Sequence, residues 1–340
     1  MINNISLNNF RQFDNLKLNT NNSLVIISGK NAHGKTSILE SIFIASTTKS
    51  HRENNLENVI KFNEPFSKIE INAEKKYKVV ISKENKNLFI NGNEIKKSSD
   101  YLGNIDVVMI APTDISLIRG SKGDKRRFLD LNISILNKKY LNESSKYKKT
   151  LNERNVLLKS KDIDNLMLDV LTNQLVDSIK YIYDSRIYLI DKLNYYLKDI
   201  SKDMKIESIK LLYEPSYNPD NVLGSFNEKK QLDIKYQATQ IGTHRDGFKI
   251  LINDLEAEKF ASEGQSRIIY IAIKLALAKV IKELKGEPIM LLDDIYQALD
   301  KDRIASLTSY LKNNKQVFIT TTTILEIPDE ILKDALVLRV

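Results

Sequence analysis

Short apolar runs, some of them alternating with polar residues, dominate the first hundred residues. They predict strands at 2–10, 24–28, 69–73, 77–82 and 88–90. The Asn91-Gly92 pair after the last run is typical of a tight turn between two strands. Apolar residues spaced three and four apart predict one helix among the strands, over 35–45. The pattern therefore predicts an α/β layer with a β-meander attached to it.

The pattern becomes helical between about residues 114 and 201. The clearest apolar stripe extends over 168–200 and predicts one long helix with a single apolar face. A preceding stripe over 133–151 favours a helical partner that packs antiparallel against it. The segment 214–230 contains two prolines and a glycine among polar residues, which predicts a loop.

After residue 240 the pattern returns to α/β. Continuous apolar runs, which are typical of buried parallel strands, predict strands at 248–252, 289–292, 317–320 and 336–340. A helix is predicted over 265–281. We therefore expect one α/β head built from 1–113 and 240–340, and a helical lobe over 114–239 that contains an antiparallel helix pair.

The composition of the 340 residues narrows the classes of function. There are 52 Lys and Arg against 44 Asp and Glu, which gives a formal net charge of +8. This excess permits an anionic partner without requiring one, since a general richness in Lys explains it equally well. The chain has no cysteine, which excludes disulfides, thiolate zinc sites and cysteine nucleophiles. With neither a signal-like start nor a long uncharged apolar span, we expect a cytoplasmic protein that does not cross a membrane.

Residues 29–36, Gly-Lys-Asn-Ala-His-Gly-Lys-Thr, match the phosphate-binding pattern G-x-x-x-x-G-K-[ST]. The match follows an apolar strand and opens a helix, which is the context that such a loop requires. Its backbone N–H groups and the amino end of the helix are expected to bind the phosphates of ATP. Lys35 is placed to reach the β and γ phosphates, and Thr36 to offer its hydroxyl to Mg²⁺. The expected ATP-binding residues are Gly29, Lys30, Asn31, Ala32, His33, Gly34, Lys35, Thr36 and Ser37.

A nucleotide site of this kind needs a carboxylate that holds the metal ion. The apolar strand over 289–292 ends in two acids, Asp293 and Asp294. Asp293 is the candidate ligand of Mg²⁺, usually through water, and Asp294 is the candidate that orients or deprotonates the attacking water. The predicted catalytic residues are therefore Lys35, Asp293 and Asp294.

A second anion-binding surface is predicted between these two motifs. The turn Ser262-Glu263-Gly264-Gln265 stands at the start of the helix predicted over 265–281. It offers a hydroxyl and N–H groups to a γ-phosphate. A capping turn of purely structural role is the alternative when the turn is considered alone. Its place ahead of the strand with two aspartates favours the phosphate interpretation.

Together these motifs resemble the ATP-binding-cassette heads of the SMC type and, more narrowly, the RecF family. Further matches in family order lie at 9–11 (Asn-Phe-Arg), 48–52 (Thr-Lys-Ser-His-Arg), 120–130, 242–246 (Gly-Thr-His-Arg-Asp) and 320–322 (Thr-Thr-Thr). The resemblance implies an SMC-like P-loop NTPase head of the α/β class, with a β-meander and a helical second lobe. The long coiled-coil arms of SMC proteins have no room in this chain.

The resemblance also implies a mechanism. ATP binding would close a homodimer head to head, so that Ser262, Gly264 and Gln265 of one subunit complete the nucleotide site of the other. Asp300 takes the D-loop position and Thr320 the switch position. RecF-like proteins bind duplex DNA near single-strand gaps and, with RecO and RecR, help to load RecA. Slow, DNA-stimulated ATP hydrolysis then releases them from DNA.

Three positions depart from transporter cassettes, namely Glu263, Asp294 and the segment 320–322. They stand where transporters have glycine, glutamate and the switch histidine, and all three are like the RecF family. No glutamine is assigned to the Q-loop role. The missing coupling residues disfavour a transporter subunit, and the lack of a spare acidic cluster or domain disfavours a P-loop nuclease or kinase.

Basic residues are the candidate DNA contacts. They are Arg52 and Arg245 in the family motifs, and a cluster of Lys122, Lys125, Arg126 and Arg127 at the entrance to the helical lobe. Cationic groups on one face contact phosphates without discriminating between base sequences. A solvated helix face explains the cluster equally well. Structural ion pairs or γ-phosphate contacts are the alternatives for Arg52 and Arg245.

Overall fold

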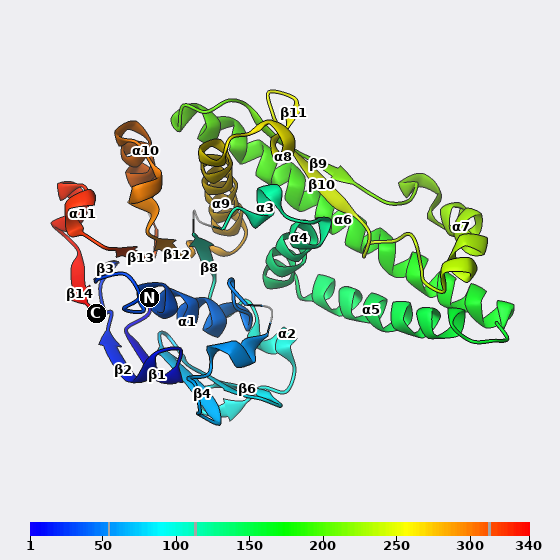
Figure 1. The fold of residues 1–340 in the computed structure, drawn as a ribbon, viewed down its shortest axis with the longest axis horizontal. Helices are drawn as coiled ribbons and strands as arrows, with labels where there is room; N and C mark the ends of the chain where they lie inside the picture. Colours follow the sequence, from blue (N-terminus) through cyan, green and yellow to red (C-terminus); the bar gives the residue numbers. More distant parts are fainter. Residues whose placement is uncertain (54, 112–113, 312–313) are drawn as a thin grey trace. The chain divides into compact units, whose positions relative to one another are not determined.

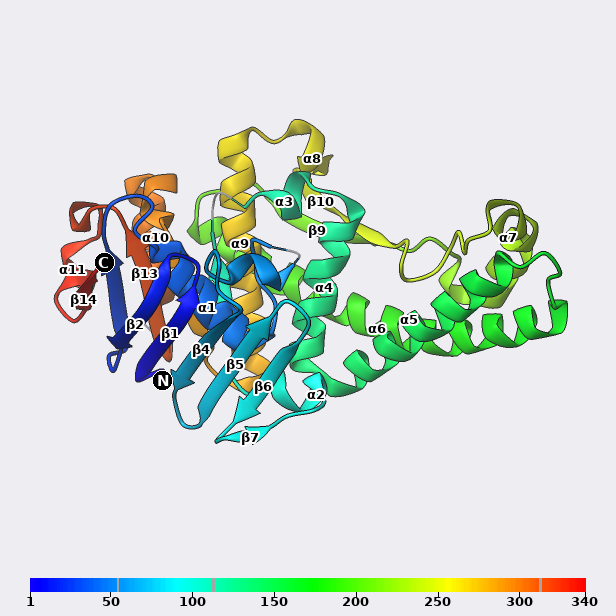
Figure 2. The same cartoon turned by 60° about the horizontal axis from the view of Figure 1, so that its bottom comes forward.

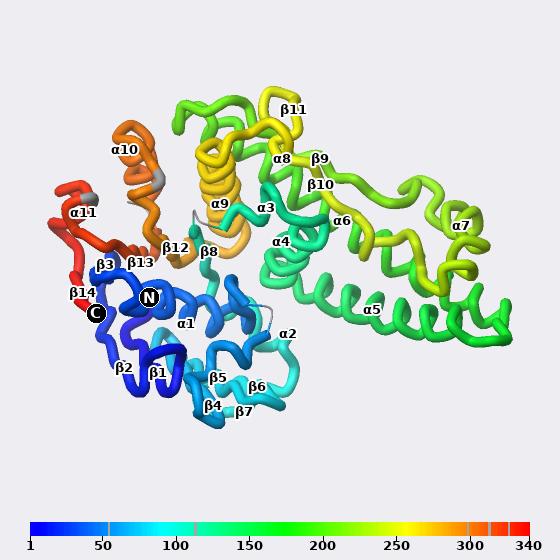
Figure 3. Tube along the Cα trace, in the orientation of Figure 1, coloured from blue at the N-terminus to red at the C-terminus, as the bar shows by residue number. Residues whose placement is uncertain are grey.

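The computed structural model describes residues 1–53, 55–111, 114–311 and 314–340 (Figure 1). These residues form two compact units. The first comprises Met1–Asp114, Asp199–Ile206 and Glu263–Val340, and the second comprises Ile115–Lys198 and Glu207–Ser262. Both ends of the chain, marked in Figure 3, lie in the first unit.

Within the described residues, the first unit contains a parallel sheet of five strands in the order β14-β3-β13-β12-β8. The strands are β3 (Leu24–Ser28), β8 (Val107–Ile110), β12 (Ile289–Asp293), β13 (Gln316–Thr321) and β14 (Leu336–Arg339). β8, β12 and β13 are buried along almost their whole length, so the prediction of buried parallel strands is confirmed for 289–292 and 317–320. It is wrong for 248–252, which forms an antiparallel strand of another sheet, and the parallel strand at 336–340 is not buried. The carboxyl ends of parallel strands share one edge, and there Asp293 is paired with Thr320.

The other sheet of the first unit is antiparallel, in the order β2-β1-β4-β5-β6-β7. Its strands, blue to cyan in Figure 2, are β1 (Asn4–Phe10), β2 (Phe13–Asn19), β4 (Phe66–Asn72), β5 (Lys76–Ser82), β6 (Lys86–Ile90) and β7 (Asn93–Glu94). Buried and partly exposed positions alternate along β4 and β5, so one face of the sheet packs inward. The predicted meander is present, and Asn91-Gly92 joins β6 to β7 as a hairpin.

Helix α1 (Lys35–Thr47) packs against both sheets, because it contacts β4 and β5 of one and β8, β12 and β13 of the other. Every residue of α1 except Thr36 is buried. The first unit also contains α2 (Ser98–Tyr101), α9 (Glu263–Lys285), α10 (Lys301–Leu311), α11 (Asp329–Leu332), η1 (Leu56–Val59), η3 (Ile295–Ala298) and η4 (Ile324–Glu326). Over the described ranges, none of the helices combines the length and the apolar character that a membrane crossing requires.

The second unit contains most of the predicted helical lobe. Its helices are α3 (Ser116–Arg119), α4 (Lys122–Leu136), α5 (Lys138–Leu158), η2 (Pro219–Asn221), α7 (Val222–Tyr236) and α8 (Ala257–Phe260). A small antiparallel sheet is formed by β9 (Ile209–Glu214), β10 (Gly247–Ile252) and β11 (Leu255–Glu256). Helix α6 (Asn165–Asp203) begins in this unit and ends in the first, and it confirms the long helix predicted over 168–200.

The preceding apolar stripe belongs to two helices. Asn137 ends α4, and its side chain caps α5 by accepting from the Tyr140 N–H at 3.1 Å. The prediction of an antiparallel partner for α6 is confirmed for α5. Ser178 of α6 donates to Glu143 near the start of α5 at 3.3 Å, and Arg154 near the end of α5 donates to Thr172, which lies earlier on α6.

Two further predictions are wrong. The predicted loop over 214–230 contains η2 and the first turns of α7, because Asn221 caps α7 by accepting from the Gly224 N–H at 2.9 Å and Pro219 fits the first turn of η2. The expected division at 240 is displaced, since β10 pairs along its length with β9 and residues up to Ser262 stay in the second unit. The expected division at 113 lies outside the described residues.

Candidate nucleotide-binding site

The phosphate-binding loop owes its shape to a glycine. Gly34 caps α1 in the left-handed region at φ 92°, and a Cβ there would lie 2.0 Å from the side-chain nitrogen of Gln12. Glycine meets both demands, because it adopts positive φ without cost and has no Cβ. Lys35 Nζ donates to the carbonyl oxygens of Gly29 and Lys30, at 2.9 and 3.1 Å. The Lys35 ammonium is therefore held against the loop that the motif predicts to bind phosphate.

The amino end of α1 is open to an anion. Gly34 has no side chain to occupy the first N–H groups of the helix, and the first turn carries no acidic residue. The loop residues from Lys30 to His33 are exposed, whereas Ser37 is buried and donates to Gln12 Oε1 at 3.3 Å. N–H groups and positive potential are thus presented together at the start of α1.

The candidate metal-binding residues meet at the edge of the parallel sheet. Thr36 Oγ1 donates to both carboxylate oxygens of Asp293, at 2.9 and 3.0 Å. Thr320 Oγ1 donates to Asp293 Oδ1 at 2.7 Å. Burial raises the pKa of the Asp293 carboxyl, and the two hydroxyl hydrogen bonds oppose that shift. A hydroxyl and a carboxylate in contact are the oxygen donors that Mg²⁺ prefers, so these residues fit the metal ion that the motif implies.

Asp294 follows directly and adopts a backbone conformation that is unusual for aspartate. It lies in the left-handed region, at φ 47° and ψ 36°, and begins η3. Its N–H donates to Thr320 Oγ1 at 3.0 Å, so the hydroxyl of Thr320 contacts both aspartates. Nearby, Gln297 donates to Thr322 Oγ1 at 2.8 Å. The segment after β12 is therefore tied to the end of β13, at the position expected for the switch.

The turn Ser262-Glu263-Gly264-Gln265, called the signature turn from here on, lies at the amino end of α9. Ser262, Glu263 and Gly264 are exposed, and Gln265 is half-buried. Glu263 forms an ion pair with Arg267 one turn later, at 2.5 Å. The turn thus stands exposed at the start of a 23-residue helix, where a helix amino end carries positive potential.

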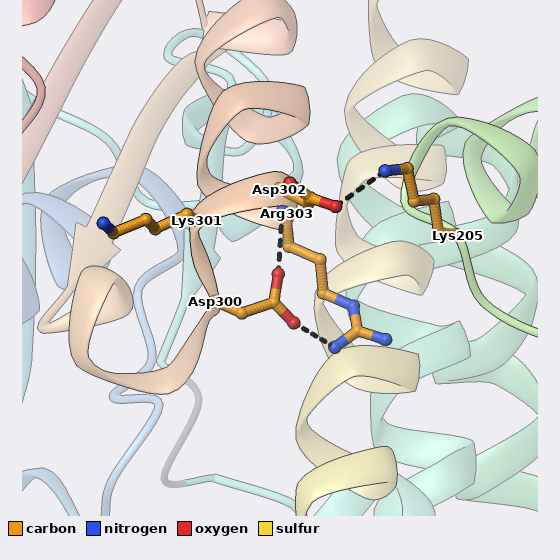
Figure 4. A pocket seen from close by; sticks show the side chains of 5 residues that line it. All are labelled: Lys205, Asp300, Lys301, Asp302 and Arg303. Carbon is orange, nitrogen blue, oxygen red and sulfur yellow. Dashed lines mark hydrogen bonds and ion pairs between the residues drawn. The ribbon is translucent and has the colours of Figure 1, made fainter.

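Asp300, the D-loop candidate, stands immediately before α10. It lines an open hollow of about 450 Å³ together with Lys205, Lys301, Asp302 and Arg303 (Figure 4). Arg303 contacts Asp300 twice, from its backbone N–H at 3.0 Å and from its guanidinium at 2.5 Å. The aspartate is therefore held by its own helix.

Buried Glu40 is a residue that the motifs missed. It lies on α1 one turn after Thr36, has no exposed surface, and accepts from Arg11 Nε and Nη2 at 2.9 and 2.7 Å. Ser50 also donates to Glu40, at 2.5 Å, whereas Arg52 is 3.8 Å away with its side chain about half exposed. An acid on the apolar face of the predicted helix was the available signal, because a buried charge needs a partner.

The basic cluster of the second unit does not form one solvated face. Lys125 is buried and pairs with Glu258 at 2.9 Å, and Arg126 Nη1 donates to the carbonyl oxygen of Asp246 at 2.7 Å. Lys122 and Arg127 are exposed, and Arg127 lies 3.4 Å from Asp124 in an i,i+3 pair. The structure therefore separates one buried and one partly buried cation of the cluster from two that face solvent.

The Gly-Thr-His-Arg-Asp motif is mostly buried. Arg186, which is 3% exposed, donates to the Thr243 carbonyl oxygen at 2.8 Å and pairs with Asp130 at 2.8 Å. Asp246 has no exposed surface and accepts from the Tyr213 hydroxyl at 2.6 Å. Arg245 is the exposed member of the motif. These contacts join α4, α6 and β9, so four of the five motif residues serve the interior of the unit.

Residues 1–330 match the model of the RecF/RecN/SMC N-terminal domain family. A protein of Acholeplasma laidlawii named DNA replication and repair protein RecF is 42% identical over 325 residues, which cover 94% of this chain and 93% of that protein. The chain belongs to the RecF family. The protein of the same name from Lactobacillus johnsonii is 35% identical to this RecF-family chain, over 97% of the chain and 95% of the relative.

Solved structures agree with the RecF assignment. A structure of the recombination mediator protein RecF with ATP, described within the RecFOR pathway, superposes with a TM-score of 0.90 at 29% identity and covers 96% of this chain and 93% of that one. An Smc head domain derived from Pyrococcus furiosus superposes with a TM-score of 0.54 at 16% identity, covering 99% of this chain and 92% of that one, which shows a shared fold. The SMC-like ATPase head and the RecF resemblance, both expected from the motifs, are confirmed.

Proposed function

We propose that this RecF-family chain is an ATP-dependent DNA-binding switch of replication and recombinational repair. ATP closes a homodimer on duplex DNA near single-strand gaps, where the protein helps RecO and RecR to load RecA. Slow, DNA-stimulated hydrolysis of ATP to ADP and phosphate then opens the dimer. The relatives named for DNA replication and repair, and the RecF structure described within the RecFOR pathway, support this role.

The contact of Thr36 and Thr320 with Asp293 carries the ATPase part of the proposal. When ATP binds, the Lys35 ammonium exchanges the carbonyl oxygens of Gly29 and Lys30 for phosphate oxygens. Thr36 and Asp293 would hold Mg²⁺, which would neutralise developing charge on the phosphates. Asp294 orients or deprotonates the attacking water. Its short side chain suits a switch with slow turnover.

The exposed signature turn supports the dimer. Ser262, Gly264 and Gln265 stand at a helix amino end that offers donors to a partner's γ-phosphate. In a two-fold symmetric dimer the same turn meets the partner's phosphate-binding loop twice, so two ATP molecules are enclosed. Each subunit alone has an incomplete site, which makes closure depend on ATP.

DNA binding rests on phosphate contacts. The net charge of +8 and the exposed cations Lys122, Arg127 and Arg245, with Arg52 of the first unit, favour contacts that ignore base sequence. Such binding weakens as salt rises, because bound counterions are released from DNA. Because chromosomal DNA is the proposed partner, we expect the protein to act in the cytoplasm.

Sedimentation with and without ATP–Mg²⁺ tests the proposal, with duplex and gapped DNA at two salt concentrations. We expect a monomer that becomes a DNA-bound dimer only with ATP, and more weakly at the higher salt. A monomer that responds to neither ATP nor DNA would overturn the proposed function. Binding to DNA that is independent of ATP would leave the DNA contact but remove the ATP-driven closure.

A further inference from the structure

The carboxyl end of α6 is fastened to α10 within the first unit. After α6 ends at Asp203, the chain turns at Lys205, which lies in the left-handed region at φ 51°. The N–H of Ile206 donates back to the Ser201 carbonyl oxygen at 2.9 Å and closes the helix end. The Lys205 ammonium pairs with Asp302 of α10 at 2.6 Å (Figure 4).

One face of α10 binds this helix end. Arg303 Nε donates to the Met204 carbonyl oxygen at 3.3 Å, and Ser306 Oγ donates to the Asp203 carbonyl oxygen at 2.6 Å. The Tyr310 hydroxyl donates to the Asp203 carboxylate. The three donors recur at helical spacing and therefore lie along one face. The last carbonyl groups of a helix have no partner within it. The donors of α10 therefore bind backbone carbonyl oxygens at the end of α6 as well as the side chain of Asp203.

Arg303 has a second partner, Asp300. Its guanidinium pairs with Asp300 Oδ2 at 2.5 Å, and its backbone N–H donates to Oδ1 at 3.0 Å. Figure 4 shows Asp300 and Arg303 turned toward one another, whereas Lys301 points away from them. One guanidinium therefore joins the end of α6 to the aspartate at the D-loop position.

Asp300 in turn stands at one end of the short segment that carries the candidate base. Asp294 begins η3 in a left-handed conformation, and Asp300 closes the same segment just before α10 begins at Lys301. On the β13 side, Thr320 accepts from the Asp294 N–H and Thr322 accepts from the side chain of Gln297. A displacement of Asp300 therefore acts on a segment that is fixed at its other end beside Asp293.

We propose that Arg303 is a positioning residue that couples the end of α6 to Asp300, and that DNA held by the second unit changes the rate of ATP hydrolysis through it. The coupling follows from chain connectivity, because α6 is one continuous helix of 39 residues with its first part in the second unit and its last turn in the first. A continuous hydrogen-bonded helix transmits a pull or a twist along its axis to its end. This inference rests on the proposed function, since it needs an ATPase that responds to DNA.

The experiment compares ATP hydrolysis with and without DNA in the full-length protein carrying Arg303→Ala, Arg303→Lys, Tyr310→Phe or Lys301→Ala. In Arg303→Ala we expect the ratio of the two rates to fall about three- to tenfold. Arg303→Lys keeps the charge but lacks the planar guanidinium that reaches Met204 and Asp300 together. Its ratio is therefore expected to stay close to that of Arg303→Ala. Tyr310→Phe loosens α6 without touching Asp300 and is expected to lower the ratio less.

Lys301→Ala is the matched control, because it removes a neighbouring cation that points away from Asp300. It is expected to keep the wild-type ratio and the wild-type rates. A wild-type ratio in Arg303→Ala overturns the coupling, as does an equal fall of both rates, which indicates a structural role only. A wild-type protein that hydrolyses ATP but ignores DNA also overturns it, whereas a wild-type protein without any ATPase overturns the proposed function instead.

Discussion

Thr36 and Asp293 are 257 positions apart in the chain, yet the threonine hydroxyl lies 2.9 and 3.0 Å from the two carboxylate oxygens of the aspartate. The parallel pairing of β3, β13 and β12 produces this contact, because it brings the loop after β3 and the end of β12 to one edge of the sheet. The hydroxyl and the carboxylate are thus in place before a nucleotide arrives. Ordering them costs little further free energy on binding, which favours a preformed ATP site.

Replacing Lys35 with methionine tests the phosphate contact. The change removes a buried cation while it keeps most of the side-chain volume, and we expect it to weaken ATP binding by about 2–5 kcal/mol. ATP-dependent dimerisation should disappear with it. Isothermal titration and sedimentation measure the two effects, with Lys83→Met at an exposed position as the charge-matched control. Unchanged ATP-dependent dimerisation in Lys35→Met would refute the role of the loop.

Asp294→Asn tests the hydrolysis step. An amide cannot accept the proton of the attacking water, so we expect the single-turnover rate of ATP hydrolysis to fall about 10²- to 10⁴-fold. ATP binding should persist, because Lys35, Thr36 and Asp293 are untouched. The variant is therefore expected to remain on DNA as a closed dimer, which dissociation in excess competitor DNA can follow. Release faster than that of the wild type would contradict this assignment.

The sequence patterns that succeeded are those that depend on local spacing. Buried parallel strands appear as continuous apolar runs, and the long helix α6 appears as a periodic stripe, because each is apolar where it packs. β2 was not predicted, since it is an edge strand without a fully buried residue. α10 was not predicted either, because it buries few residues and turns a polar face to the end of α6.

The site was predicted as far as its motifs extend along the chain. The loop around Lys35 and the aspartates after β12 are contiguous patterns, and the fold brings them together. The partners of Glu40 and Arg186 could not be assigned, because the ion pairs join residues from distant segments. The same limit explains why Lys125 and Arg126 were grouped with solvent-facing cations. Spacing along a helix cannot reveal an acid or a carbonyl group that another segment supplies.

Glu40→Ala tests the buried ion pair behind the phosphate-binding loop. The change leaves the largely buried Arg11 guanidinium without its carboxylate, and we expect a loss of about 3–5 kcal/mol in the free energy of unfolding. Arg52→Ala, which removes a half-exposed cation 3.8 Å from the same acid, should cost less than about 1 kcal/mol. Urea unfolding at neutral pH measures both. Equal losses in the two variants would show that the pair with Arg11 is not the dominant contact.

Protonation of the largely buried His244 is expected to lower the stability of the protein in acid. Burial lowers its pKa from 6.5 to about 4, while its ring accepts from the Tyr147 hydroxyl and donates to the Thr239 carbonyl oxygen. Between these pH values the unfolded chain binds a proton more readily than the folded chain. The contribution of the neutral His244 ring to the free energy of unfolding is therefore complete above pH 6.5. It is lost as the pH falls to about 4, by about 3 kcal/mol in total.

Urea unfolding from pH 7.5 to pH 4 isolates this contribution when His244→Gln is compared with the wild type. The glutamine variant cannot take up the proton, so its free energy of unfolding should fall less over the interval. His33→Gln, which removes an exposed histidine, is the matched control. Parallel profiles for wild type and His244→Gln would exclude His244 as the titrating group.

Lys122 and Lys125 differ in exposure, so replacing each one tests whether it contacts DNA or stabilises the fold. Lys122 is exposed and Lys125 is buried against Glu258, although only three positions divide them on α4. We expect Lys122→Ala, and likewise Arg127→Ala, to weaken binding to all duplex sequences and to reduce the slope of log K against log salt by about one. Lys125→Ala should lower thermal stability and leave that slope unchanged. Fluorescence anisotropy over a salt series measures the slopes, and a reduced slope in Lys125→Ala with a wild-type slope in Lys122→Ala would reverse the assignment of the two lysines.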